Sequence, residues 1–253
     1  MALTLEKMME RTNTRRLNTL IRAIEAEDRN AIHRALSKGV NVNQLDKNEL
    51  TPLMYAAGTD NVEIMNMLLH VGANPQGRRP PIVWGEDAQA MGMQREVEGS
   101  TALHFVYHKT WFGGGPTTVE PMKLLLDAGG DPNDCNHLGE SLLYQYIRHA
   151  LFYSRRLYEA QQARRDTSGP TLWKQTCVQL VELLLATGAD PNRGGRHGVT
   201  PLMLTGLSTL LTKMLLDAGA DVHLRDEEGR NALSCAEHPE VIRMLREAGA
   251  VEA

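Results

Sequence analysis

The stretch LLLATGADPN at residues 183–192 decides the architecture, because near-copies of it recur along the chain. The copies read LLHVGANPQ from Leu68, LLLDAGGDPN from Leu124, MLLDAGADVH from Met214 and MLREAGA from Met244, with a weaker RALSKGVNVN from Arg34. Their glycines are Gly39, Gly72, Gly129, Gly188, Gly219 and Gly249, at spacings of 33, 57, 59, 31 and 30 residues. A period near 33 with two enlarged units is typical of a stacked repeat array.

A second recurring signal precedes each of the five stronger copies of this phrase. It reads LTPLMYAA from Leu50, GSTALHFV from Gly99, GESLLYQY from Gly139, GVTPLMLT from Gly198 and GRNALSCA from Gly229. Thr51 and Thr200 are predicted to cap helices whose first residue is proline, where the missing N–H costs nothing. Gly72 is predicted to end a helix in the left-handed conformation. Each unit should therefore hold a short inner helix and an outer helix.

Together the two signals resemble the ankyrin repeat, in which a hairpin, TPLHxA, two helices and GADVN follow one another. The resemblance spans about residues 18–249 and implies one all-α solenoid domain of helix pairs with β-hairpin-like finger loops. The expected units are 18–45, 46–76, 96–135, 136–194, 195–225 and 226–253, with insertions at 77–98, 108–118 and 150–176. Residues 1–17 are expected to form an N-terminal capping helix.

The two ends of the array are expected to act as caps. In the first segment Leu3, Leu5, Met8 and Met9 should cover the first unit. Arg34 and Arg246 occupy positions that carry leucine or methionine in inner units, and polar residues on terminal repeats keep an array in solution. The C-terminal units should unfold first, because coupling between neighbours is lowest at an end.

Composition excludes several classes of protein. A net charge of −4 gives no general reason to expect nucleic acid. The three cysteines lie in different repeats and are expected to be reduced thiols. The N-terminal segment lacks an apolar signal core, and no stretch approaches the roughly 20 apolar residues of a membrane span. We therefore expect a cytoplasmic protein, periplasmic or secreted only if a signal has been removed, with no membrane association.

The sequence shows no motif for catalysis or cofactor binding. Gly113–Gly115 lack the Lys-Ser/Thr that completes a phosphate-binding loop, and Cys135 with His137 has no second ligand pair at metal spacing. His104 stands at the histidine position of the repeat, where the resemblance implies a structural role. No enzyme activity, cofactor or metal is predicted.

The insertions contain all three tryptophans, Trp84, Trp111 and Trp173. Repeats that stack on leucine and alanine do not need tryptophan, and aromatic side chains dominate many binding interfaces. The alternative is that each aromatic residue pins its own loop to the repeat. We favour pinning for any single tryptophan and a partner contact for at least one of the three.

The third insertion is predicted to extend one inner helix from Glu140 to Arg164, about 36 Å long. An apolar stripe along this helix should pack against the second insertion. The helix carries arginines among tyrosines and phenylalanine. Three interpretations stay open: a solvated helix with local ion pairs, a surface for an acidic protein, and a nucleic-acid surface, which no motif supports.

The resemblance implies a module that binds a specific protein with its concave face, and we expect it to be a monomer. Partner contacts are predicted at Lys47, Asn48, Leu50, Trp84, Trp111, Phe112, Arg148, Tyr153, Arg155, Arg156, Tyr158, Trp173, Arg196, His197, Glu227 and Glu228. Two functions compete. One is a stoichiometric inhibitor, such as an immunity or self-protection protein, of an enzyme or toxin. The other is an adaptor, scaffold or secreted effector that recruits several proteins without inhibiting them.

Overall fold

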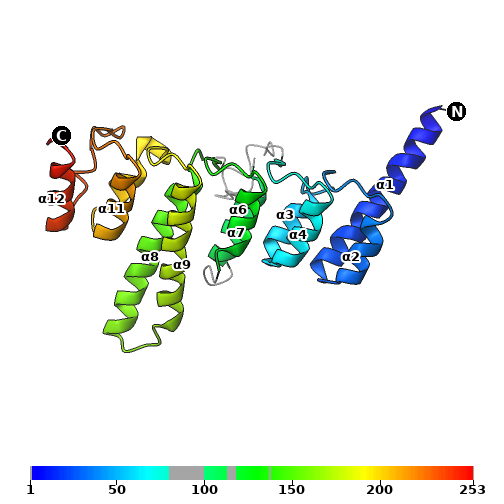
Figure 1. The fold of residues 1–253 in the computed structure, drawn as a ribbon, viewed down its shortest axis with the longest axis horizontal. Coiled ribbons are helices and arrows are strands. Elements are labelled where there is room, and N and C mark those ends of the chain that lie inside the picture. The colour runs from blue at the N-terminus through cyan, green and yellow to red at the C-terminus, as the bar shows by residue number, and fades with distance from the viewer. Residues whose placement is uncertain (1, 80–99, 113–117, 137, 253) are drawn as a thin grey trace, which may run out of the picture. The chain divides into compact units, whose positions relative to one another are not determined.

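The computed structural model describes residues 2–79, 100–112, 118–136 and 138–252. The helices up to Gly130 form one compact unit and those from Asp131 onward form another, and each is described by itself (Figure 1). Within the described ranges the regular elements are helices, and the one extended pairing is an isolated bridge between Cys135 and Ser141. The predicted all-α architecture of helix pairs is confirmed. The prediction of one domain over residues 18–249 stays a prediction.

The first unit contains three helix pairs. They are α1 (Ala2–Glu25) with α2 (Arg29–Leu36), α3 (Pro52–Thr59) with α4 (Val62–His70), and α6 (Ala102–Phe112) with α7 (Glu120–Asp127). The inner helix α3 contacts both α1 and α6, and the outer helix α4 contacts α7. Fully buried aliphatic side chains fill the layers between them, including Leu20, Ile32, Leu53, Leu68 and Leu125.

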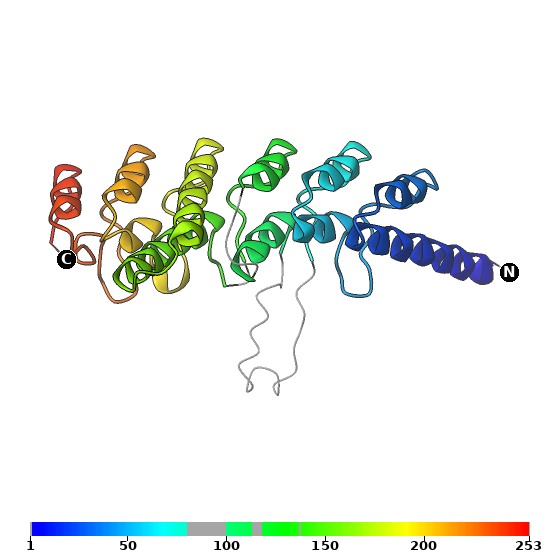
Figure 2. The same cartoon turned by 90° about the horizontal axis from the view of Figure 1, so that it is seen from below.

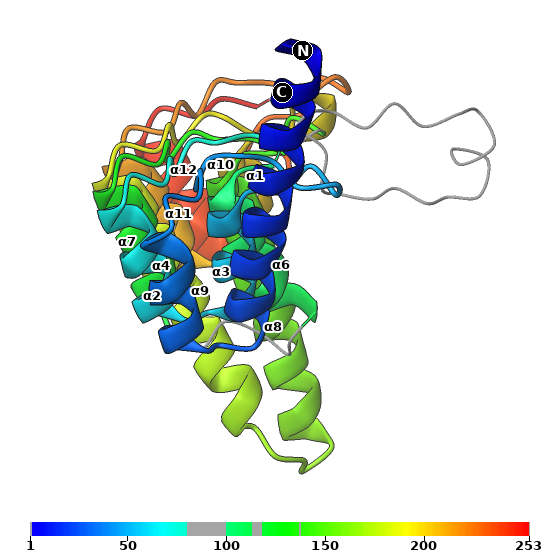
Figure 3. The same ribbon diagram turned by 90° about the vertical axis from the view of Figure 1, so that its right-hand side faces the viewer.

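The second unit pairs α8 (Leu142–Gln162) with α9 (Ser168–Ala186), and α10 (Pro201–Leu204) with α11 (Thr209–Asp217); a short 3-10 turn η1 (Arg196–Gly198) precedes α10. The last helix is α12 (Pro239–Glu247), and the inner segment of its repeat forms turns at residues 232–235. Helices α8 and α9 lie side by side and extend well beyond the ends of α11 and α12 (Figures 1 and 3). We call these two helices and their connection the helical hairpin.

The predicted local signals have the expected geometry. Thr51 and Thr200 are N-caps whose side-chain oxygens accept the backbone N–H of Met54 and Met203, and proline follows each. All six glycines that close the repeats have a positive φ, which at Gly72 is 90°. Only glycine reaches that conformation at little cost, so these residues fix where each outer helix ends.

Asparagine side chains join successive repeats. The Nδ2 of Asn43 donates to the carbonyl of Gly72 at 2.9 Å, and its Oδ1 accepts the N–H of Asn74 at 2.7 Å. In the second unit Asn133 makes the same two bonds, to Gly188 at 3.1 Å and from Asp190 at 2.6 Å. These bonds satisfy backbone groups that follow a helix end, and they set the spacing between finger loops.

One expectation about the N-terminal cap is wrong, and the third insertion holds more helix than the sequence predicted. The predicted capping segment and the first inner helix form one continuous helix, α1, which runs past α2 (Figure 2). Met8 and Met9 are 66% and 61% exposed, so they do not cover the first unit. The third insertion lengthens both helices of its repeat, and α8 packs against α9. The predicted contact of α8 with the second insertion involves residues outside the described ranges and stays a prediction. Most of the first insertion, with Trp84, lies outside the described residues.

Candidate protein-binding surface

The first finger loop, residues 46–50, is organised around the carboxylate of Asp46. This carboxylate accepts the backbone N–H groups of Asn48 and Leu50 at 2.9 and 3.0 Å and the hydroxyl of Tyr55 at 2.8 Å. Asn48 also donates to the Tyr55 oxygen at 2.9 Å. Burial is the main cause that raises the pKa of Tyr55 to about 12, so the hydroxyl keeps its proton. Lys47 and Asn48 are exposed at the tip of a loop whose shape is already set.

The same design recurs in the second unit. In residues 136–140 the Oδ1 of Asn136 accepts the N–H groups of Leu138 and Glu140 at 2.9 and 3.1 Å. In residues 226–230 the buried carboxylate of Asp226 accepts the N–H groups of Glu228 and Arg230 at 3.0 and 2.8 Å. The guanidinium of Arg230 pairs with Asp226 at 2.8 Å. These loops therefore need little further ordering when a partner binds.

The finger loop at residues 195–199 is joined to the finger loop at 226–230. His197 has a φ of 59°, and its carbonyl accepts the N–H of Glu227 at 2.9 Å. Its Nδ1 lies 2.9 Å from a carboxylate oxygen of Glu227. Both side chains stay largely exposed, at 74% and 69%. The structure thus brings two predicted contact residues from neighbouring repeats together at one point of the surface, beside Arg196 and Glu228.

The two helices of the helical hairpin enclose a small core of their own. The ring of Tyr153 on α8 lies 5.4 Å from the Trp173 ring on α9, and Cys177 is buried one turn further along α9. Burial raises the pKa of Tyr153 and of Cys177 to about 12. Tyr153 is only 3% exposed, so its predicted partner contact is corrected: the ring stabilises the hairpin.

Trp173 is half-buried in the same contact. A Cβ added at Gly169 would lie 3.2 Å from its ring, so the backbone of α9 also packs against the indole. This is the pinning role that the sequence left open for a single tryptophan.

Arg148 couples the hairpin to a finger loop. Its guanidinium pairs with the buried carboxylate of Glu140 at 3.0 Å and lies 5.9 Å from the centre of the Tyr144 ring. Glu140 in turn accepts a hydrogen bond from the Asn136 side chain at 3.1 Å. The partner contact predicted at Arg148 therefore comes from a side chain that is 43% exposed and held in place.

The hairpin exposes both apolar and basic side chains. Phe152, Tyr158 and Leu172 are 40%, 62% and 45% exposed. Arg156 lies over the Phe152 ring at 5.6 Å, and Arg155 pairs with Glu159 at 3.0 Å. We call Phe152, Arg155, Arg156, Tyr158 and Leu172 the hairpin surface. The sequence prediction missed Phe152 and Leu172 as contacts, although both fall in the third insertion.

The remaining predicted contacts are Trp111 and Phe112, which belong to the last turn of α6. The directions of their side chains, like the whole of Trp84, lie outside the described residues. Leu50 is half-buried at the base of its finger loop.

Candidate metal ligands and the buried histidine of the third repeat bear on chemistry at the described residues. No group of three or more His, Cys, Asp or Glu in this part of the chain could hold a metal ion. His104 is fully buried, and its Nδ1 accepts the N–H of Thr101 at 3.3 Å, the structural role predicted for it. None of the described helices is long and apolar enough to cross a membrane.

Comparison with protein families and curated proteins places the repeats. The family model for ankyrin repeats, in three copies, matches residues 3–79. A bovine (Bos taurus) protein, the inactive serine/threonine-protein kinase TEX14, is 46% identical over 57 residues. That match covers 21% of this chain and only 4% of the kinase-like protein.

Two solved structures are similar over nearly the whole chain. An ankyrin repeat domain from Acinetobacter baumannii AYE has a TM-score of 0.65 and 19% identity, with 92% of this chain and 98% of that chain covered. A chain in the complex of the Bdellovibrio bacteriovorus predatory endopeptidase Bd0816 with immunity protein Bd3460 has a TM-score of 0.57 and 20% identity. It covers 90% of this chain and 97% of its own length. At these identities the two structures show a shared fold.

Proposed function

Because the chain is an ankyrin-repeat protein, a class of protein–protein interaction module, we propose that it binds one specific protein and inhibits it stoichiometrically. The contacts are assigned to the finger loops and to the hairpin surface. An immunity or self-protection role, in which the chain occludes the active site of an enzyme or toxin, is the function proposed. We further propose that it works as a monomer in the cytoplasm, where the free thiols of Cys135, Cys177 and Cys235 would stay reduced.

The exposed apolar and basic residues of the hairpin carry this proposal. Three large apolar side chains exposed on one inserted element exceed what a solvated helix pair needs, and their arginines supply the directional contacts that hot spots favour. The arginines of this surface suit a partner with carboxylates around an apolar cavity. Nucleic acid is a weaker match, because the chain as a whole is acidic.

Rigidity supports inhibition in preference to recruitment of many partners. The hairpin has its own aromatic core, and the finger loops at residues 46–50 and 226–230 are closed by side-chain hydrogen bonds. A surface that is ordered before binding loses little conformational entropy, so high affinity for one partner is favoured. The similarity to a chain from an endopeptidase–immunity protein complex supports the same interpretation.

The test compares two triple variants of matched character. In the first, Phe152, Tyr158 and Leu172 become alanine. In the second, Val71, Leu207 and Leu210, which are also large, apolar and exposed, become alanine. Each protein captures its partner from a lysate of the source organism, and mass spectrometry identifies what is retained. We expect one stoichiometric partner, bound more than about tenfold more weakly by the hairpin variant than by the control variant.

The activity of the captured partner then separates the two functions. Loss of activity at one equivalent of wild-type chain, and not of the hairpin variant, supports the inhibitor. Several partners that keep their activity would contradict it and establish the adaptor. Equal capture by both variants would show that the hairpin surface is not the binding surface.

A further inference from the structure

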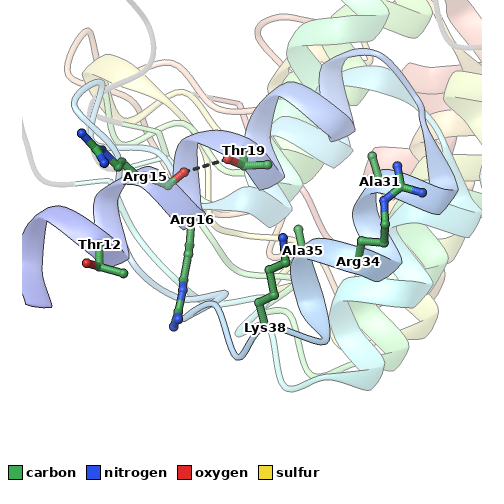
Figure 4. Close-up of a pocket in the computed structure, with 8 residues that line it drawn as sticks. All are labelled: Thr12, Arg15, Arg16, Thr19, Ala31, Arg34, Ala35 and Lys38. Atoms are coloured by element: carbon green, nitrogen blue, oxygen red, sulfur yellow. Dashed lines mark hydrogen bonds between the residues drawn. The ribbon is translucent and has the colours of Figure 1, made fainter.

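The first repeat contains a basic groove between α1 and α2. It encloses about 280 Å³ and is lined by Thr12, Arg15, Arg16 and Thr19 from α1, by Ala31, Arg34 and Ala35 from α2, and by Lys38 from the turn after α2 (Figure 4). The α1 residues follow the spacing i, i+3, i+4 and i+7 and the α2 residues the spacing i, i+3 and i+4, so each set falls on one helical face. Two such faces opposite each other make the groove.

The hollow follows from the sizes of the lining residues. Alanine and threonine stand between the long basic side chains, so the helices approach without filling the space between them. All four cations, Arg15, Arg16, Arg34 and Lys38, are exposed. The hydroxyls of Thr12 and Thr19 donate to carbonyls of α1, which leaves their oxygens able to accept further hydrogen bonds.

The four cations lack counter-ions. Among the residues that the structure describes, none of them forms an ion pair, whereas Arg29 on the same helix α2 pairs with Glu63. No acidic residue lines the groove. Four like charges around one hollow repel one another, and an anionic ligand removes this repulsion.

We propose that this groove binds an acidic peptide segment of a partner protein. Guanidinium groups pair with carboxylates in a bidentate geometry, and the volume suits a few side chains and not a folded surface. Met8, which is 66% exposed, lies one turn before Thr12 on the same face of α1. It supplies an apolar contact for a residue that flanks the acidic side chains.

Other polyanions match the groove less well. Single-stranded nucleic acid binds through aromatic side chains that stack on bases, and none of the eight lining residues is aromatic. A membrane surface is bound by a broad apolar helix face with basic residues beside it, whereas this site is concave and lined by charges. The groove is separate from the hairpin surface, so the inference does not depend on the proposed function.

The test uses the full chain and a labelled peptide rich in glutamate with one central leucine. A matched peptide carries glutamine in place of glutamate. We expect the acidic peptide to bind in low salt and to be released as salt increases, and the glutamine peptide to bind at least about tenfold more weakly. RNA oligonucleotides and phosphatidylserine vesicles serve as the competing ligands.

Charge-reversal variants locate the site. Arg16→Glu with Lys38→Glu should weaken peptide binding by more than about tenfold. Lys123→Glu with Lys213→Glu changes the net charge equally at exposed positions outside both surfaces and should leave binding nearly unchanged. The milder Arg16→Gln with Lys38→Gln is used if the reversal variant loses its helical circular dichroism.

The outcomes separate the groove from the hairpin. Alanine at Phe152 and Tyr158 should leave the affinity for the acidic peptide unchanged, even where it weakens binding of the partner protein captured in the test of the proposed function. Peptide binding that is absent, or equally weakened by both charge-reversal variants, would overturn the proposal. Tighter binding of RNA or vesicles through Arg16 and Lys38 would also overturn it.

Discussion

Two repeats of the second unit begin and end alike but differ greatly in length. Ser141 and Thr200 cap their inner helices by accepting the N–H of the third helical residue, and Gly188 and Gly219 close their outer helices with φ of 94° and 85°. Between these points α8 and α9 have 21 and 19 residues, whereas α10 and α11 have 4 and 9. The N-cap residue and the closing glycine therefore fix where each repeat begins and ends, and they leave the lengths of the helices between them free. We call this pair of fixed boundaries the repeat frame.

The longer repeat is stable because its added turns bring their own contacts. Tyr153 and Trp173 pack together beyond the level of the stack. The shorter repeat closes its turn with a buried hydrogen bond of 2.9 Å between the hydroxyls of Thr212 and Thr205. Apolar and basic residues accumulate on the added turns, where the stack does not constrain them. A variable length between fixed caps thus allows one repeat to acquire a binding surface.

The largest expected effect tests the shared frame. Leu184 and Leu215 occupy equivalent positions before the closing glycine, and both are fully buried. Replacement of either by alanine should lower the free energy of unfolding by about 2–5 kcal/mol, since each leaves a cavity in the stack. Urea denaturation followed by circular dichroism measures this. A large loss at Leu215 with none at Leu184 would show that the long repeat has left the common frame.

A smaller and more local effect is expected in the added turns. Trp173→Ala should cost about 1–3 kcal/mol, because the indole is only half-buried and its loss opens the hairpin core. Hydrogen exchange should accelerate in residues 151–175 and stay slow in α11. Tyr158→Ala is the matched control, since its side chain is 62% exposed. Faster exchange throughout the second unit would mean that the hairpin and the stack unfold together.

The sequence predicted the repeat frame because each boundary depends on local chemistry. A threonine followed by proline, or a glycine at a left-handed position, has one favourable conformation whatever surrounds it. The finger loops followed from the same signals, and His104 has the role expected of it.

The lengths of the inserted elements and the partners of their side chains were harder to predict. Gly169 and Pro170 lie in the first turn of α9, where proline is tolerated, so the second helix of the hairpin was hidden. The burial of Tyr153 depends on Trp173, twenty residues away, and periodicity within one helix does not reveal such a pair. The basic groove forms only where two helices pack side by side. The spacing of its basic residues can be read along each segment, but the sequence does not reveal that the two segments face each other.

The finger loop before the long repeat and the finger loop after the short repeat differ in one titratable group. Asn136 organises the loop before the long repeat, and Asp226 organises the loop after the short one. Burial acts to raise the pKa of the Asp226 carboxyl, but hydrogen bonds from Arg230 and Glu228 outweigh it and hold this pKa below the ordinary value of 3.8. The unfolded chain therefore takes up this proton first as the pH falls.

Asp226→Asn should consequently lower the melting temperature at neutral pH, by less than either leucine variant does. The difference from wild type should persist down to about pH 5 and shrink below it, as the wild-type carboxylate is protonated. Thermal unfolding followed by circular dichroism across this range measures the difference. Asn136→Asp is the reciprocal control. A difference that stays constant to low pH would show that Asp226 acts only through its shape.

The smallest effect concerns the last repeat, which is shorter still. Its inner segment forms turns in place of a helix, and among the described helices the main neighbour of α12 is α11. Exposed ion pairs of Arg243 with Glu240 and Glu247 add little, because such pairs contribute at most about 1 kcal/mol each. Amides of α12 should therefore exchange faster than those of α11, and those of α9 beside Leu184 should exchange most slowly. Mass spectrometry of exchanged peptides resolves the three helices. Equal protection of α9, α11 and α12 would mean that the second unit unfolds in one cooperative step, and stability would then not follow repeat length.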